Sequence, residues 1–281
     1  MTARAPVTAV VCTRDRSEQL AAAVRSLVAD LGAEDEVLVV DAGAPPADPI
    51  SSLTGDGCAV RFVSVEVAGK SRQLNRALRE ARSAVVVCTD DDATVAAGWV
   101  DAMVAPFADG RVGVVFGPVT GLTRHGDAPS PSVRPGPAPL ATWLYAHGVA
   151  MAVRTSAALA VGGFDERLGP GAPAHGEEHD LLIRLWERGW EARIADAPAV
   201  VHDEWRDDVQ HERNLLVYER GGGALVGAAL RRHPLRWAGL GARRLRYQWA
   251  LLRDSPLGFR TVRAFAGGLW YGLRLRPWTS P

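Results

Sequence analysis

Three features are scarce or missing in this sequence: cysteine, lysine and long apolar runs. The three cysteines, Cys12, Cys58 and Cys88, lack metal-ligand spacing, and two fall in expected strands, so we expect small buried side chains and a reducing, cytoplasmic setting. Charge returns at Arg14 soon after the first apolar run, so no signal segment is expected. The longest uncharged stretch, 135–153, begins with three prolines in five residues and predicts no membrane-spanning helix.

Lys70 is the only lysine, and the remaining positive charge is unevenly distributed. Residues 221–281 contain eleven arginines and one acid, Asp254, which gives +10. Because the whole chain is neutral, residues 1–220 carry −10. We therefore expect an acidic main domain over 1–220 and a cationic, Arg/Trp-rich helical tail over 221–281.

Apolar periodicity predicts an α/β fold with a mostly parallel central sheet flanked by helices. Short β-branched runs predict strands over 7–12, 36–40, 60–65, 84–87, 112–119 and 199–201, and 143–153 is strand-like. Helical stripes predict helices over 17–30, 99–107, 155–161 and from 177 to Gly189, and a further helix after 69–72 that carries Leu74, Ala77, Leu78 and Ala81. The proline-rich stretch 120–139 predicts a surface loop.

Three consecutive carboxylates, Asp90, Asp91 and Asp92, follow the apolar strand 84–87. They repel one another and need a counter-charge, for which Mg2+ or Mn2+ is suited because these ions prefer oxygen ligands. In an open α/β sheet, ligands bind at the carboxyl ends of the strands, where these acids are expected. The alternative is that the acids cap a helix that begins near Ala97.

Several segments together resemble the family 2 glycosyltransferases, nucleotide-sugar-dependent enzymes of the GT-A fold. They occur in the family's order at 13–16 (TRDR), 39–43 (VVDAG), 69–75 (GKSRQLN), 90–92 (DDD), 162–166 (GGFDE) and 176–181 (GEEHDL). The resemblance covers about 7–202 and implies a GT-A catalytic domain with a basic helical appendage. It implies a nucleotide-sugar half over about 1–119 and an acceptor half over about 140–220. Ala42, Ala150 and Glu178 depart from the family's pattern, where Asp, Asn and Asp are usual.

By this resemblance, Asp92 and Asp90 bind the divalent cation, Mn2+ or Mg2+, and His202 approaches the same ion. For His202 the alternative is a hydrogen bond to local backbone at a strand end. Glu178 is the first choice for the base that deprotonates the acceptor, with Glu177 and Asp180 as neighbouring candidates. Helix capping is the structural alternative for these three acids.

The resemblance also implies a donor site for a nucleoside-diphosphate sugar of uracil, guanine or thymine. The residues expected there are Thr13, Arg14, Asp41, Lys70, Arg72, Asp90 and Asp91. The acceptor is a carbohydrate, a lipid-linked molecule or a small molecule. In-line attack of its hydroxyl would invert the anomeric centre. A retaining GT-A enzyme and a degenerate nucleotide-sugar-binding scaffold are the alternatives, the latter because of Ala42 and Ala150.

The tail interleaves arginine with Trp237, Trp249, Trp270 and Trp278. The apolar positions Phe259, Val262, Ala266, Leu269 and Leu273 follow helical spacing, with arginines to one side. This pattern is typical of a helix on an anionic membrane surface, which would place the protein at the inner face of the cytoplasmic membrane. The alternative is packing on the catalytic domain or on a second subunit in a homo-oligomer. No base-reading motif accompanies the arginines, so nucleic acid is not expected.

Overall fold

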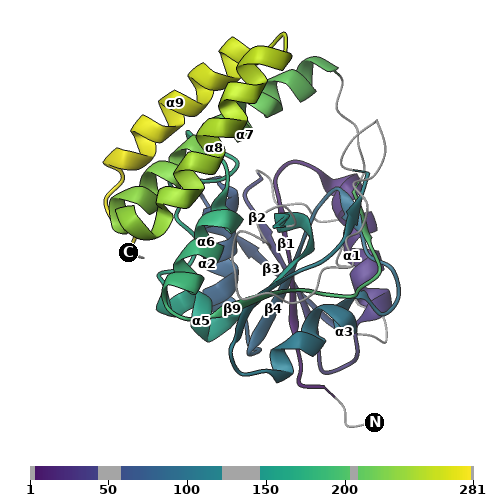
Figure 1. Cartoon of the computed structure of the whole chain (residues 1–281). Helices are drawn as coiled ribbons and strands as arrows, with labels where there is room; N and C mark the ends of the chain where they lie inside the picture. Colours follow the sequence, from purple (N-terminus) through teal and green to yellow (C-terminus); the bar gives the residue numbers. More distant parts are fainter. Residues whose placement is uncertain (1–3, 44–57, 122–145, 203–207, 280–281) are drawn as a thin grey trace.

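The computed structural model describes residues 4–43, 58–121, 146–202 and 208–279. Its main feature is a seven-stranded sheet in the order β3-β2-β1-β4-β8-β6-β9 (Figure 1). The strands are β1 (Thr8–Thr13), β2 (Glu36–Asp41), β3 (Ala59–Ser64), β4 (Val85–Asp90), β6 (Val112–Phe116), β8 (Met151–Arg154) and β9 (Glu191–Ile194). Only β8 runs antiparallel to its neighbours, so the expected mostly parallel sheet is confirmed.

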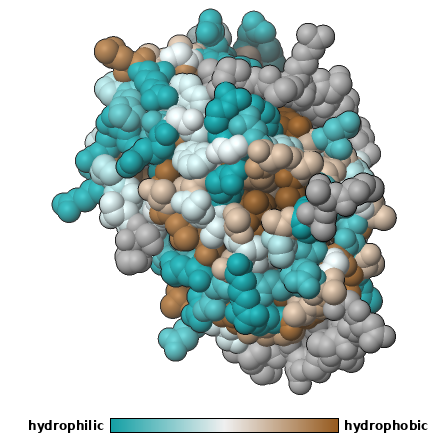
Figure 2. All heavy atoms as spheres, turned by 90° about the horizontal axis from the view of Figure 1, so that it is seen from below, coloured by the Kyte–Doolittle hydropathy of each residue, from teal (hydrophilic) through white to brown (hydrophobic). Residues whose placement is uncertain are grey.

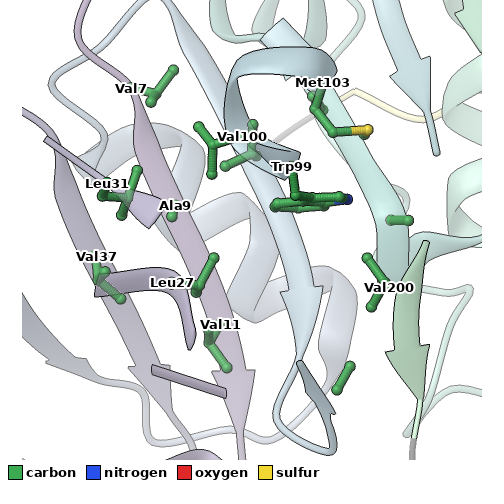
Figure 3. Packing of buried hydrophobic residues seen from close by; sticks show 14 of the residues in the cluster. Val7, Ala9, Val11, Leu27, Leu31, Val37, Trp99, Val100, Met103 and Val200 are labelled. Carbon is green, nitrogen blue, oxygen red and sulfur yellow. The ribbon is translucent and has the colours of Figure 1, made fainter. Parts of the chain in front are cut away.

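Helices cover both faces of this sheet because its strands alternate two sets of apolar side chains. On one face, Ala9 and Val11 pack with side chains of α1 (Ser17–Asp30) and α3 (Trp99–Val104), as Figure 3 shows for Leu27 and Trp99. On the other face, Val10 packs with residues of α2 (Lys70–Glu80), α5 (Thr155–Ala160) and α6 (Glu177–Glu187).

Four sequence expectations differ from the structure. The strand expected over 112–119 divides into β6 and β7 (Val119–Thr120), because the Gly117-Pro118 step interrupts it and proline cannot donate to a strand ladder. The helix expected over 99–107 is α3 followed by the 3-10 helix η2 (Ala105–Ala108). In 143–153, the described part starts at 146, with η4 (Gly148–Ala150) ahead of β8. Strand β9 was not predicted, because its sequence EARI has little apolar character. Most of the loop 120–139 lies outside the described residues.

A second, three-stranded sheet in the order β5-β10-β7 lies at the end of β4. It joins β5 (Ala93–Thr94) to β10 (Val200–His202), and β10 to β7. Its register pairs His202 with Ala93, the residue directly after the acidic triplet. This pairing brings the late histidine to the carboxylates.

The chain ends in three helices, α7 (Asp208–Arg232), α8 (Pro234–Asp254) and α9 (Gly258–Arg274), which lie together at the top of Figure 1. Helix α7 runs through the expected 220/221 boundary. The helices pack on α6 through a cluster that includes Ile183 and Trp237. None of the described helices combines the length and apolarity needed to cross a membrane.

Glycines bring α7 and α9 into backbone contact. A Cβ added at Gly268 would lie 1.8 Å from the carbonyl oxygen of Arg220, and one at Gly223 would lie 2.0 Å from that of Phe265. The buried residues of α9 are Gly258, Thr261, Phe265, Gly268 and Gly272. Of the apolar stripe expected from the sequence, Phe259, Ala266 and Leu273 are exposed on another face, whereas Leu269 packs partly against the cluster of Ile183 and Trp237.

Candidate active site

The candidate site lies at the carboxyl ends of the central parallel strands. Thr13 at the end of β1 is in register with Asp41 at the end of β2, and Cys12 is in register with Asp90 at the end of β4. A cavity of about 920 Å³ opens here and contains the acidic triplet, parts of α2 and α6, and residues of α7. The strand-end position expected for the acids is therefore confirmed.

Each acid of the triplet accepts a hydrogen bond from a cationic or hydroxyl group, and Asp91 and Asp92 share Arg16. The hydroxyl of Thr13 donates to Asp91 Oδ2 at 2.7 Å, and Arg16 Nη1 donates to Asp91 Oδ1 at 3.1 Å and Asp92 Oδ2 at 3.0 Å. Lys70 Nζ donates to Asp90 Oδ1. Burial raises the pKa of Asp91, as do the charges of Asp92 and Asp90, while Thr13 and Arg16 partly offset this effect. The segment 13–16 and Lys70 thus supply the counter-charge that three adjacent carboxylates need.

Asp90, Asp92 and His202 form a possible metal-binding group. One ligand atom from each lies within 4.8 Å of the others, and His202 Nε2 is 3.3 Å from Asp92 Oδ1. The buried Nδ1 of His202 has no hydrogen-bond partner among the described residues. Two carboxylates and one imidazole form a donor set that suits Mn2+ and also accommodates Mg2+. The residues present therefore fit the expected cation.

The other acids of the cavity lie at the start of α6. Gly176 precedes the helix with a left-handed φ of 103°, a conformation that glycine adopts without strain, and the next two residues, Glu177 and Glu178, line the cavity. Burial raises the pKa of Glu177 to about 8, and the charge of Glu178 adds to this effect.

Glu178 is held in its ionised form by its neighbour in the sequence. Burial opposes its ionisation, but His179 Nδ1 lies 3.1 Å from Glu178 Oε1, and this contact keeps the pKa of Glu178 well below its usual value. Burial lowers the pKa values of His147 and His175, which line the same cavity. At the start of α6 the pKa shifts therefore favour the ionised form of Glu178 and the protonated form of Glu177.

The structure brings most of the predicted site residues together. The cavity is lined by Thr13, Arg14, Lys70, Asp90, Asp91, Asp92, Glu177, Glu178 and His202. Burial opposes the charge on Lys70, but the carboxylate of Asp90, to which Lys70 donates, raises its pKa, so it stays cationic.

Three predicted site residues lie outside the described lining of the cavity. Asp180 accepts a hydrogen bond from Arg184 Nε at 2.7 Å and lies 3.5 Å from Arg232, which is a structural contact between α6 and α7. Arg72 is exposed and pairs with Glu166 at 3.2 Å. Asp41 Oδ1 accepts from the backbone N–H of Gly43, next to residues 44–57, which the structure does not describe.

Sequence reasoning gave no role to Arg16, His179 or the residues of α7 that line the cavity. Arg16 was part of the quoted segment 13–16, and three adjacent acids require counter-charge, so that signal was present in the sequence. Helix α7 contributes Asn214, Leu215, Tyr218, Glu219, Gly222 and Leu225, and α8 contributes Arg244. Nothing in a local pattern predicts that these helices form a wall of the cavity.

The fold is that of the GT-A class. Mannosyltransferase PcManGT from Pyrobaculum calidifontis, solved in complex with GDP-Man and Mn2+, superposes with a TM-score of 0.63 at 20% identity, covering 96% of this chain and 77% of that one. TarS 1–349 of S. aureus, in complex with UDP-GlcNAc, gives 0.63 at 15% identity, covering 94% and 71%. GalNAc-T7 with UDP, GalNAc and Mn2+ gives 0.59 at 14% identity, covering 80% and 48%.

Sequence comparison gives the same class. Residues 8–142, slightly less than half of the chain, match the family model described as Glycosyl transferase family 2. The chain is 28% identical over 210 residues to the Pre-mycofactocin glycosyltransferase of Mycobacterium tuberculosis, a match that covers 70% of this chain. It spans 42% of that relative, so it corresponds to less than half of the curated protein. In sequence the chain is therefore similar to glycosyltransferases.

Proposed function

We propose that this chain is an inverting, metal-dependent glycosyltransferase that moves a sugar from a nucleoside-diphosphate donor to an acceptor hydroxyl. The observation that carries the proposal is the combination in one cavity of the group Asp90, Asp92 and His202 with the ionised carboxylate Glu178. Relatives of the same fold bind GDP-Man, UDP-GlcNAc and UDP, which supports a nucleotide-sugar donor here.

Asp90, Asp92 and His202 would hold the cation, which is Mn2+ or Mg2+. When bound, it supplies Lewis-acid stabilisation of the negative charge that develops on the departing diphosphate. Lys70 and Arg16 already lie against the triplet, so they can share their hydrogen bonds with the phosphate oxygens of a donor. Thr13 keeps Asp91 oriented through its 2.7 Å hydrogen bond.

Glu178 acts as the base. Its carboxylate takes the proton of the acceptor hydroxyl as the new bond to the anomeric carbon forms and the bond to the diphosphate oxygen breaks. Attack opposite the leaving group inverts the anomeric centre. The hydrogen bond from His179 keeps Glu178 ionised at neutral pH, which is the state a base requires.

The donor can be identified by measuring the thermal stability of the full chain with UDP-, GDP- and dTDP-sugars, each with and without Mn2+. We expect one nucleotide to raise Tm, and Mn2+ to enlarge the effect. Stabilisation without turnover on any hydroxyl acceptor would favour the nucleotide-sugar-binding scaffold. The anomeric configuration of the product, read by NMR, separates inverting from retaining transfer.

Two isosteric variants test the base. Glu178→Gln should lower kcat by about 10²–10⁴-fold while the thermal shift with the best donor is unchanged, because only proton transfer is lost. Glu177→Gln is the matched control, since it alters the adjacent buried carboxyl, whose pKa burial raises to about 8, and it should leave kcat near that of the wild type. If Glu178→Gln retained kcat within tenfold of the wild type, the base would have to be another group.

A further inference from the structure

Helix α8 carries an apolar stripe that no described residue covers. Its members, spaced by three and four residues along one helix face, are Leu235, Ala238, Ala242, Leu245, Trp249 and Leu252, all exposed. The side chains of Leu235 and Trp249 are 94% and 70% exposed, whereas Trp237 and Leu240 on another face are buried in the packing with α6 and α7. Burial in the fold therefore uses only one side of this helix.

Helix α9 shows a similar division. Its buried face contacts α7 through glycines and Phe265, and Leu269 at the edge of the predicted stripe packs against the cluster of Ile183 and Trp237. The rest of the stripe includes a free face on which Phe259, Ala266 and Leu273 are exposed. On this free face Phe259 and Trp270 are 73% and 58% exposed. Large aromatic side chains are seldom left this open unless another surface covers them.

Cationic side chains accompany both stripes. Arg243 and Arg246 of α8 and Arg263 of α9 are exposed and form no ion pair with any described residue. Arg274 stacks on Trp270 at 4.0 Å from the ring centroid. The single acid of residues 221–281, Asp254, is already paired with Arg253. The exposed stripes of α8 and α9 and these arginines are here termed the tail surface.

We propose that the tail surface binds an anionic lipid membrane. Amphipathic helices with Trp, Phe and Leu beside arginine lie in the interface of such membranes, where the rings enter the headgroup region and the arginines contact anionic lipids. A second copy of this chain is a poor fit, because a two-fold interface would place the same arginine-rich surface against itself. The molecule seen from below has hydrophilic residues over much of its surface and a group of hydrophobic residues near the centre of this face (Figure 2).

The helices that carry the tail surface are in contact with the candidate site. A Cβ at Gly221 of α7 would lie 2.5 Å from the carbonyl oxygen of His175, and one at Gly176 would lie 2.7 Å from Leu225, so α7 packs directly on the loop before Glu177. Arg244 of α8 lines the cavity itself. A membrane bound on α8 and α9 would therefore hold the cavity near the lipid headgroups, where a lipid-linked acceptor would be located.

Sedimentation of the full chain with vesicles tests this proposal without depending on the proposed activity. At low salt we expect the chain to pellet with phosphatidylcholine vesicles that contain phosphatidylglycerol, to stay in solution with phosphatidylcholine alone, and to be released by high salt. The variant Arg243→Gln/Arg246→Gln/Arg263→Gln should partition on the order of tenfold or more weakly. Leu245→Ser/Trp249→Ser should also lose binding.

Matched controls change equally exposed side chains elsewhere. Arg25→Gln/Arg79→Gln/Arg82→Gln removes three exposed arginines from the main domain, and Val67→Ser/Leu159→Ser removes two exposed apolar side chains. Both variants should bind the anionic vesicles as strongly as the wild type does. Failure of the wild type to pellet with anionic vesicles at low salt would overturn the proposal. Two other results would also overturn it. One is a wild-type dimer in sedimentation equilibrium that Leu245→Ser/Trp249→Ser converts to a monomer while vesicle binding is unchanged. The other is binding of the wild type to DNA but not to vesicles.

Discussion

The contact between α7 and α9 predicts opposite effects for one substitution at two neighbouring glycines. A Cβ at Gly268 would lie 1.8 Å from the carbonyl oxygen of Arg220, against the 3.0 Å that real Cβ atoms keep, so the helix must move by about 1.2 Å. Such overpacking costs about 1–3 kcal/mol, and the better helix propensity of alanine returns about 1 kcal/mol. Because the required shift is large, the cost should lie at the upper end of this range, so Gly268→Ala should destabilise the chain by about 2 kcal/mol, or about 4–8 °C in Tm.

Gly267 is the matched control, because it is the next residue of the same helix. The nearest atom to an added Cβ there is the flexible guanidinium of Arg220 at 3.7 Å, so Gly267→Ala keeps only the propensity gain of about 1 kcal/mol. Gly239→Ala in α8, with no atom within 4 Å, should behave likewise. Thermal unfolding followed by far-UV circular dichroism measures all three. If Gly268→Ala melted at or above the wild-type temperature, the close backbone contact would be refuted.

Three further predictions concern the site. Asp92→Asn should abolish the Mn2+-dependent part of the thermal shift with the best donor, whereas the exposed control Asp196→Asn should retain it. If Asp92→Asn kept the full shift, Asp92 would not be a metal ligand. Because burial raises the folded-state pKa of Glu177, the stability its protonated form contributes is lost as pH rises through about 8. Thermal melts should then show the Tm of Glu177→Gln rising relative to the wild type between about pH 5 and about pH 9, and parallel curves would contradict this. His179→Asn should raise the pKa of Glu178, so the acid limb of the pH–rate profile should move to higher pH, and an unmoved limb would show that His179 does not tune the base.

The strand-end acids show how far local sequence could carry the prediction. Short β-branched runs with polar ends, at 7–12, 36–40 and 84–87, were enough to place Thr13, Asp41 and Asp90 along one edge of a parallel sheet. Residues directly after a buried strand must lie at its end, so the same positions could be predicted for Asp91 and Asp92. The start of α6 was predictable for the same reason, because its acids and the preceding glycine form a local helix signal.

Other partners of these acids depend on segments far apart in the chain. His202 reaches Asp92 only through the small sheet that pairs it with Ala93, and Arg184 and Arg232 draw Asp180 away from the cavity lining. Three adjacent acids require positive charge, but they do not specify which of the many arginines provides it. The choice of Arg16 follows from the packing of α1 and β4 at the same sheet edge.

The tail shows most clearly what the sequence determines and what only the tertiary structure determines. Its composition alone fixed a cationic, tryptophan-rich set of helices, because charge and amphipathic spacing are properties of the chain itself. The tertiary structure decides which face of α9 is buried. A hydrophobic stripe indicates where side chains could be buried, whereas the glycines of α9 lie where its backbone contacts that of α7. Glycines that allow backbone contact give no apolar signal in the sequence, so only the packed helices show that Phe259, Ala266 and Leu273 are left exposed.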